Sequence, residues 1–340
     1  MAIESDTSRQ TSIRVGVLGA ANIVKEALLR PSARVEGIEV VAIAARDPER
    51  AARYAARHGI GKVHASYSSL LDDRDIDAVY IPLPSALHAQ WMTAALEAGK
   101  HILCEKPFTS NAAAAEEVAS AAATSSVVLM EAYHSHYHPL RQRLHDIIES
   151  GELGDIWSAT AIACAPIPPG KDIRWNFELG GGGLLDLGYY PLRLLRDLFG
   201  EVTGMTATAK TRGEIDACLE AQLTHAGGVR STLLSSIWSR KLLASRLEVQ
   251  GSQGRMRVGT PTHPQLGGRI RIDGIRGSRV ERPVRRSTFD YQLEAFRDAI
   301  RGGAVQTGAR EAVAQLRTID ALYQAAGLST RPSSPARAHT

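Results

Sequence analysis

Residues 13–24 read IRVGVLGAANIV, an apolar run that leads directly into a turn of small residues. Such a short apolar run is typical of a strand buried on both faces. Small residues after the strand let the backbone approach a pyrophosphate at the N-terminus of the next helix. The turn resembles the G-x-G-x-x-G pattern, with Gly19, Ala21 and Val24 at the glycine positions, and so predicts dinucleotide binding. The expected cofactor-binding residues of this turn are Gly19, Ala20, Ala21, Asn22 and Ile23.

As far as about Met130, short apolar runs alternate with longer Ala-rich amphipathic stretches. This alternation predicts βαβ units and a parallel, doubly wound sheet of the α/β class. The expected strands are Ile13–Leu18, Val40–Ala44, Ala78–Leu83, His101–Cys104 and Val127–Met130. The expected helices lie near Ile23–Arg30, Pro48–Arg57, Ala86–Ala98 and Ala112–Ala123.

The pattern changes after His134, where several strand-like segments follow one another without helices between them. Runs of this kind favour a large, mostly antiparallel open sheet within an α+β domain. The expected strands are Ile156–Ala165, Thr203–Lys210, Leu219–Thr224, Val229–Ser236 and Arg246–Gln250. The expected helices are His138–Ser150, Tyr291–Arg301 and Arg310–Ala326.

A length of 340 residues suits two domains. The predicted divisions are a disordered tail over 1–11, a Rossmann domain over 12–132, a substrate-binding and oligomerisation domain over 133–328 and a disordered tail over 329–340. The tails are assigned from their polar, Ser/Pro/Arg-rich composition.

Composition narrows the class of protein. Forty Lys and Arg against 36 Asp and Glu give a net charge of +4, which favours anionic small molecules. The basic run between 276 and 286 has no interleaved aromatic residues, so no nucleic-acid partner is expected. No apolar stretch reaches the length of a membrane span. Cys104, Cys164 and Cys218 have neither disulfide nor metal spacing, which favours a reducing cytoplasm.

The end of the second expected strand bears on the choice of cofactor. NAD enzymes commonly place a carboxylate there for the ribose hydroxyls, whereas the extra phosphate of NADP needs a cation. Ala45 stands at the usual acidic position and is followed by Arg46, whose guanidinium can hold a phosphate. NADP(H) is therefore the preferred cofactor, with NAD(H) as the alternative. The alternative interpretation is that Asp47 caps the next helix and Arg46 is merely exposed to solvent, and both interpretations can hold together.

Two further segments carry a family resemblance. Residues 81–88 read IPLPSALH, and residues 98–107 read AGKHILCEKP. Further matches are MEA at 130–132, DIRW at 172–175, GGGLLDLGYYP at 181–191 and LEAFRDAI at 293–300. The chain, apart from its tails, resembles the glucose–fructose oxidoreductase / inositol dehydrogenase (Gfo/Idh/MocA) family. It looks most similar to the branch that contains dimeric dihydrodiol dehydrogenase.

The resemblance implies an NAD(P)-dependent oxidoreductase that acts on a secondary alcohol or ketone of a sugar, polyol or cyclic diol. It implies that Lys106 and Tyr190 lie at the reacting carbon with Asp186 beside them, and that the C-terminal sheet forms a homodimer or homotetramer. The further implied cofactor contacts are Leu83, Pro84, His88, Glu105 and Lys106. The implied substrate contacts are Lys106, His136, Arg174, Trp175, Asp186 and Tyr190. A non-catalytic, cofactor-bound sensor of the same fold is the alternative.

Lys106 and Tyr190 suit this chemistry because negative charge builds on the substrate oxygen during hydride transfer. We expect the lysine ammonium to lower the pKa of the tyrosine, which would exchange the proton; the reverse assignment stays open. Asp186 and Tyr190 are four residues apart and share a helical face. Pro191 cannot donate to the Leu187 carbonyl, so the helix should start or kink there and aim Tyr190 into the cleft.

His134, His136 and His138 alternate along the chain after the last expected strand of the first domain. On a strand they would share one face, as metal ligands do. Pocket lining and plain packing are the other interpretations, and no metal is expected. The family usually has an arginine where His136 stands.

Overall fold

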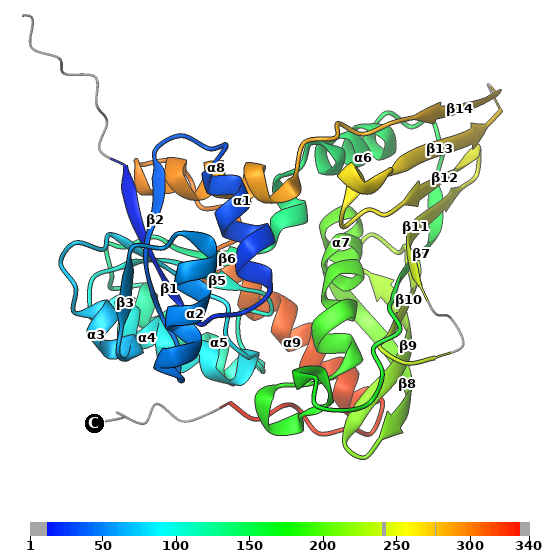
Figure 1. The fold of residues 1–340 in the computed structure, drawn as a ribbon. Helices are drawn as coiled ribbons and strands as arrows, with labels where there is room; N and C mark the ends of the chain where they lie inside the picture. The colour runs from blue at the N-terminus through cyan, green and yellow to red at the C-terminus, as the bar shows by residue number, and fades with distance from the viewer. Residues whose placement is uncertain (1–11, 240–242, 276, 334–340) are drawn as a thin grey trace, which may run out of the picture.

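The protein is described by a computed structural model over residues 12–239, 243–275 and 277–333. Residues 1–11 and 334–340, which belong to the two predicted tails, lie outside the described residues. The described chain forms two sheets, of six and eight strands, that face each other across a layer of helices (Figure 1). The predicted α/β fold with a second, mostly antiparallel sheet is confirmed. No helix of the described residues is long and apolar enough to span a membrane.

The first sheet is parallel, with the strand order β3-β2-β1-β4-β5-β6 of a doubly wound fold. Its strands are β1 (Ile13–Leu18), β2 (Ile38–Ala44), β3 (Lys62–His64), β4 (Ala78–Ile81), β5 (His101–Glu105) and β6 (Leu129–Ala132). Its helices are η1 (Lys25–Leu29), α1 (Arg30–Ser32), α2 (Pro48–His58), α3 (Tyr67–Leu71), η2 (Ser85–Leu87), α4 (His88–Glu97) and α5 (Ala112–Ala122). The prediction missed β3 and α3, because segments of three and five residues have too few apolar positions to show a period.

The second sheet has the order β14-β13-β12-β11-β7-β10-β9-β8 and is antiparallel except for the parallel pair β7 and β10. Its strands are β7 (Ile156–Cys164), β8 (Val202–Arg212), β9 (Ile215–His225), β10 (Arg230–Ser236), β11 (Ala244–Gly251), β12 (Gly254–Gly259), β13 (Arg269–Gly274) and β14 (Gly277–Glu281). The strands β12 to β14 were not predicted, since arginines on their exposed face break up the apolar signal.

In the part of the chain that the structure describes, helices lie on one face of this sheet and the other face has none (Figure 1). The helices of this half are η3 (His134–Tyr137), α6 (Pro139–Glu149), η4 (Ile173–Trp175), η5 (Phe177–Leu179), η6 (Leu184–Gly188), α7 (Tyr189–Phe199) and η7 (Pro264–Leu266). Of these, η6 and α7 contact β7 and β10 of the sheet. Leu192 and Leu195 of α7 share a buried cluster with Leu219 and Leu233 of the sheet. The opposite face of the sheet carries polar residues such as Gln222 and Thr232.

Two closing helices depart from the predicted domain division. α8 (Thr288–Ile300) was assigned to the second domain, but its apolar face packs on the first sheet. Phe289, Leu293 and Phe296 share a buried cluster with Val15 and other residues of β1 and β2. α9 (Ala309–Ala325) contacts α5 and β6 of the first half and β8 of the second sheet. The boundary near 133 is therefore crossed twice by the chain.

The segment after α9 also differs from the prediction. Residues 329–333 are packed against the protein rather than forming part of a disordered tail, since Arg331 is only 1% exposed. Its guanidinium forms an ion pair with the buried Asp216 of β9. A charged residue in a Ser/Pro/Arg-rich sequence gave no sign of burial, because burial of arginine depends on a partner distant in the chain.

Candidate active site

The predicted phosphate turn lies at the carboxyl end of β1. Gly19 has a φ of +125°, which favours glycine, and a Cβ there would lie 3.0 Å from Leu83 Cδ2. Its N–H donates to the Ala44 carbonyl at 2.8 Å, which fixes the turn beside the end of β2. Asn22 and Ile23 are exposed just before η1, whereas Ala20 is buried. The turn thus presents backbone at a helix N-terminus, as a pyrophosphate requires.

Two arginines lie beside this turn. Arg46 is exposed at the end of β2, where the buried Ala45 offers no carboxylate. Arg50 Nη2 donates to the Ala20 carbonyl at 2.8 Å, which places a second guanidinium at the turn. Asp47 caps α2 by accepting the N–H groups of Glu49 and Arg50. Arg50 lies in the first turn of α2, four residues after Arg46, and was not among the predicted cofactor contacts.

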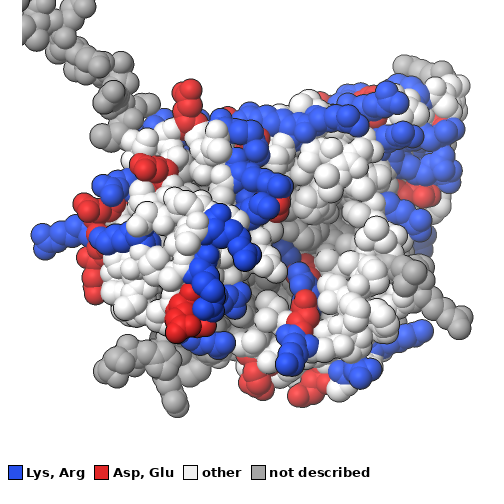
Figure 2. Space-filling view, in the orientation of Figure 1, with Lys and Arg blue, Asp and Glu red and all other residues white. Residues whose placement is uncertain are grey.

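The surface is hollowed between the two halves of the molecule, and Lys and Arg side chains gather on the Rossmann side of the hollow (Figure 2). The small turn, the helix N-terminus and the two arginines together fit a dinucleotide that carries an additional phosphate.

Of the other predicted cofactor contacts, His88 and Glu105 are buried. His88 is 1% exposed, and its ring nitrogens lie 2.8 Å from the Pro107 carbonyl oxygen and 2.7 Å from that of Leu83. The ring therefore joins two loops, and the contact of His88 with a cofactor stays a prediction. Leu83 and Pro84 are partly exposed beside the turn.

Glu105 ends β5 beneath the cleft. Tyr80 donates to Glu105 Oε1 at 2.6 Å, and the Lys106 N–H lies 3.2 Å from Oε2. Burial raises the pKa of Glu105 to about 6, against the opposing effect of Tyr80 and Lys106. The carboxyl group thus lies behind Lys106 rather than in the open cleft.

Lys106 follows β5 and reaches the second domain. Its Nζ donates to the backbone oxygen and to Oδ1 of Asp186, each at 3.0 Å. Arg174 Nε donates to the other carboxylate oxygen at 2.5 Å. Burial alone would raise the pKa of Asp186, but Lys106 and Arg174 outweigh it and lower that pKa to about 2. Asp186 is therefore a carboxylate throughout the neutral range, held between two cations.

A wide helical turn presents Asp186 and Tyr190. η6 is a π-helix that continues directly into α7. In a turn with i→i−5 pairing, the donor for the Asp186 carbonyl would be the N–H of residue 191, which proline lacks. Lys106 Nζ donates to that carbonyl instead. Pro191 was expected to free the carbonyl of Leu187; the wide turn shifts its effect by one residue.

Tyr190 lies against Lys106, whose Nζ is 4.7 Å from the centroid of the phenol ring. The hydroxyl lies 3.2 Å from His134 Nε2. Burial, together with the negative charges of Glu105 and Asp186, raises the pKa of Tyr190 well above its ordinary value. This overturns the expectation that Lys106 lowers it: the ammonium contacts the ring face and is itself paired with Asp186.

His134 was not among the predicted site residues. It lies in η3, a 3₁₀-helix, so the three alternating histidines do not share a strand face. His134 Nδ1 lies 2.8 Å from Thr288 Oγ1, whereas His138 caps α6. Burial lowers the pKa of His134 well below its ordinary value, so its ring is neutral. Within the described residues no cluster of three or more His, Cys, Asp or Glu could hold a metal.

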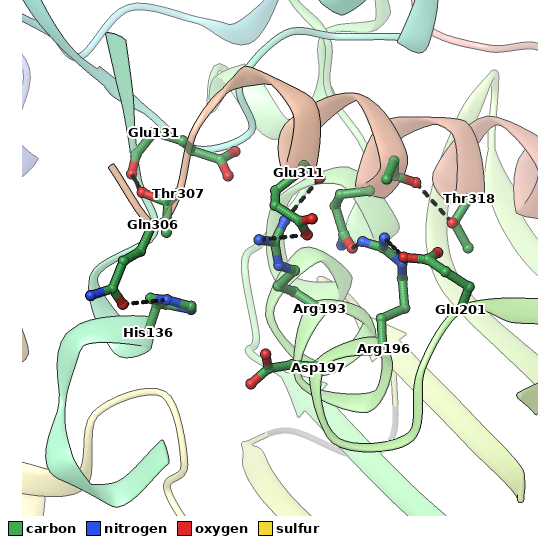
Figure 3. A network of polar contacts seen from close by, with 12 residues as sticks. Glu131, His136, Arg193, Arg196, Asp197, Glu201, Gln306, Thr307, Glu311 and Thr318 are labelled. Atoms are coloured by element: carbon green, nitrogen blue, oxygen red, sulfur yellow. Dashed lines mark hydrogen bonds and ion pairs between the residues drawn. The ribbon is translucent and has the colours of Figure 1, made fainter. Parts of the chain in front are cut away.

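His136 and Trp175 each have a hydrogen-bond partner of their own. His136 Nε2 lies 3.1 Å from Gln306 Oε1, on the far side of Thr307 from Glu131 (Figure 3). Together with Tyr190, Arg141 and Asp197 it lines a small pocket that opens to solvent. Burial lowers the pKa of His136 to about 4. Trp175 Nε1 donates to the Ile167 carbonyl at 3.2 Å beside Arg174.

Comparison with known proteins gives two family matches. Residues 13–133 match the oxidoreductase family with an NAD-binding Rossmann fold (GFO/IDH/MocA), and residues 141–257 match the GFO/IDH/MocA C-terminal domain.

Individual relatives cover most of the chain. A dTDP-3,4-didehydro-2,6-dideoxy-alpha-D-glucose 3-reductase of Saccharopolyspora spinosa is 39% identical over 72% of this chain and 74% of that protein. A D-xylose 1-dehydrogenase (NADP(+)) of Haloferax volcanii is 33% identical over 92% and 96%. A 3-ketoreductase of Actinomadura kijaniata, solved with NADP and TDP-benzene, is 30% identical with a TM-score of 0.84, over 93% of this chain and 98% of that one.

Proposed function

Because the chain belongs to the GFO/IDH/MocA family of NAD-binding oxidoreductases, we propose that it transfers a hydride between NADP(H) and a secondary alcohol or ketone of a sugar, polyol or cyclic diol. The observation that carries this proposal is the cluster of Lys106, Asp186 and Tyr190. One member follows β5 of the nucleotide-binding sheet and two lie on the helix over the second sheet.

A bound nicotinamide cofactor supplies or accepts the hydride. The backbone at Gly19 and the helix that follows would hold its pyrophosphate, and Arg46 and Arg50 would hold its 2′-phosphate. The NADP named for the xylose dehydrogenase and for the 3-ketoreductase structure agrees with this preference.

Tyr190 is the proton donor in the reductive direction. Its raised pKa keeps the hydroxyl protonated at neutral pH, so it can give a proton to an oxygen on which negative charge develops. Lys106 holds the substrate oxygen electrostatically, and Asp186 keeps the ammonium in place at 3.0 Å. Arg174, paired with Asp186, and the adjacent Trp175 are suited to contact the hydroxyl-rich part of the substrate.

A ketone on a deoxy-sugar ring is the first substrate class to examine. The 3-reductase of Saccharopolyspora spinosa acts on such a sugar, as its name states, and the 3-ketoreductase of Actinomadura kijaniata was solved with a TDP derivative. The xylose dehydrogenase name points instead to oxidation of a free aldose. Both reactions need the same arrangement of a phenol, an ammonium and a nicotinamide.

The test is turnover by the purified full-length protein. NADPH oxidation is followed with keto-sugars, free and nucleotide-linked, and NADP reduction with aldoses, polyols and cyclic diols. We expect Tyr190→Phe to lower kcat by about 100-fold or more with an unchanged Kd for NADPH, since general acid catalysis contributes roughly that much. The matched control is Tyr54→Phe, which removes the hydroxyl group of a tyrosine on α2.

Two results would count against the proposal. Normal kcat in Tyr190→Phe would exclude the assigned donor. Binding of NADPH without turnover of any of these substrates would favour the cofactor-bound sensor.

A further inference from the structure

The segment that follows α9 buries one charged side chain completely. The guanidinium of Arg331 lies 4.2 Å from the ring centroid of Tyr323 and 4.9 Å from that of Phe177. Its Nε donates to the Gly181 carbonyl at 2.5 Å, and its Nη1 donates to the Ser329 carbonyl at 2.8 Å. Nη2 donates to Asp216 Oδ1 at 2.5 Å, and both side chains of this ion pair are 0% exposed.

A buried ion pair is weak evidence for stability, because an apolar pair of similar volume often serves equally well. The location of this pair is what distinguishes it. Asp216 Oδ2 accepts the N–H of Leu184 at 2.6 Å, and Leu184 is the first residue of η6. The ion pair thus binds the Gly181 carbonyl, which precedes the helix, and the N–H of Leu184, which is the first residue of η6.

Gly182 and Gly183, which lie between the Gly181 carbonyl and the Leu184 N–H, leave room for the ion pair of Arg331 and Asp216. Gly182 has a φ of +146°, and a Cβ there would lie 2.4 Å from Asp216 Oδ1 and 2.9 Å from Arg331 Nη2. A Cβ at Gly183 would lie 2.8 Å from the Asp216 carbonyl oxygen. Gly182 and Gly183 therefore let the helix start lie closely against Asp216 and Arg331.

The same segment is attached to the nucleotide-binding half. Ser110 Oγ donates to the Pro332 carbonyl at 2.7 Å, and Asn111 Nδ2 donates to the Arg331 carbonyl at 2.8 Å. Both residues lie just before α5, a few residues after Lys106. Residues 329–333 therefore connect the strand end that carries Lys106 with the helix that carries Asp186 and Tyr190.

We propose that Arg331, through Asp216, is a positioning residue that sets the place of Asp186 and Tyr190 relative to Lys106. This inference rests on the proposed function. Lys106 and Asp186 meet at 3.0 Å across the two halves of the molecule, so a small shift of the helix start separates them. Misplacement of reacting groups by about 1 Å can cost on the order of 100-fold in rate.

The experiment compares Arg331→Met with Arg317→Ala in the full chain. Arg317 forms an exposed ion pair with Glu116 that also joins α9 to α5, but it does not contact the catalytic helix. We expect Arg331→Met to lower kcat by about 10- to 100-fold, with the KM for NADPH within about twofold of wild type. Arg317→Ala should leave both unchanged. Equal kcat in Arg331→Met and wild type would overturn the proposal.

A second variant separates positioning from folding. Arg331→Met leaves the Asp216 carboxyl group buried without its cation, whereas the double variant Asp216→Asn/Arg331→Met is neutral. If the single variant does not fold, we expect the double variant to fold and still show the lowered kcat. Restoration of wild-type kcat in the double variant would overturn the proposal.

Hydrogen exchange gives a readout that does not need turnover. We expect amides of residues 184–190 to exchange about tenfold faster in Arg331→Met or in the double variant, and at the wild-type rate in Arg317→Ala. If wild-type protein turns over no substrate, the proposed function fails while the exchange data still decide the role of Arg331. Unchanged exchange at 184–190 would refute that role.

Discussion

At the scale of single residues, the site depends on how each charge is paired. Lys106 donates to Asp186, Arg174 donates to the same carboxylate, and the Tyr190 hydroxyl faces a neutral histidine. The pKa of Tyr190 is raised because the phenol is buried and because the negative charges of Glu105 and Asp186 lie near it. A phenol in this environment gives up a proton only to a stronger base, such as an alkoxide forming during ketone reduction.

The cofactor preference is also decided by single residues. We expect Arg46→Ala and Arg50→Ala each to weaken NADPH binding by about 10- to 100-fold, which corresponds to about 1.5–3 kcal/mol for a hydrogen bond to a charged group. The Kd for NADH should change little, because NADH has no 2′-phosphate. The Kd values can be measured by quenching of protein fluorescence.

Arg53→Ala is the matched control for these variants. Arg53 lies on α2, as Arg50 does, and pairs with Glu49 and Asp47 at the exposed surface. An equal loss of NADPH and NADH affinity in Arg46→Ala would contradict the assignment of Arg46 to the phosphate.

At the scale of elements, the helix from Leu184 to Phe199 carries two devices that place its functional residues. The π-turn of η6 and Pro191 leave the Asp186 carbonyl to Lys106. The glycines before the helix admit Asp216 and Arg331. Wide helical turns of this kind occur frequently at functional sites, since they re-aim side chains without ending the helix.

Gly182→Ala tests how tightly the start of this helix is held. We expect it to lower the free energy of unfolding by more than about 2 kcal/mol, because the added methyl meets Asp216 in a backbone conformation that already strains an L residue. Gly302→Ala is the control that measures backbone strain without steric contact, since Gly302 has a φ of +102° and no atom lies within 4 Å of its Cβ position. Urea unfolding measures both variants. Equal destabilisation would show that the contacts with Asp216 and Arg331 do not matter.

At the scale of the whole molecule, one face of the second sheet carries no helix within the described residues (Figure 1). Thr160, Thr232 and Gln222 lie side by side across β7, β10 and β9 on this face. We propose that it forms the interface of a homodimer or homotetramer. The native mass should then be two or four times 36.6 kDa.

Light scattering after size-exclusion chromatography checks this mass. Thr232→Arg, which adds a charge at the centre of the face, should yield a monomer, because an uncompensated buried charge costs several kcal/mol. Ser120→Arg on the exposed side of α5 is the control and should keep the wild-type mass. A monomeric wild-type protein would refute the interface.

Much of the architecture follows from local sequence. The strand Ile13–Leu18 was predicted with its observed bounds, and α2, α5 and β7 each differ from prediction by one residue at one end, because their apolar runs and caps are local signals. The family motifs likewise located Lys106, Asp186 and Tyr190, which the folded chain brings together. Short elements such as β3 and the arginine-bearing strands β12 to β14 lack a clear local period, so they escaped prediction.

By itself, then, the sequence determined the two-sheet class, the phosphate turn and the residues available for hydride chemistry, since these depend on spacing along the chain. Only the tertiary structure decided the packing of α8 on the first sheet, the contact of His134 with Tyr190, the raised pKa of Tyr190 and the burial of Arg331 against Asp216. Each of these depends on groups distant in sequence, and burial and Coulomb interactions act through space.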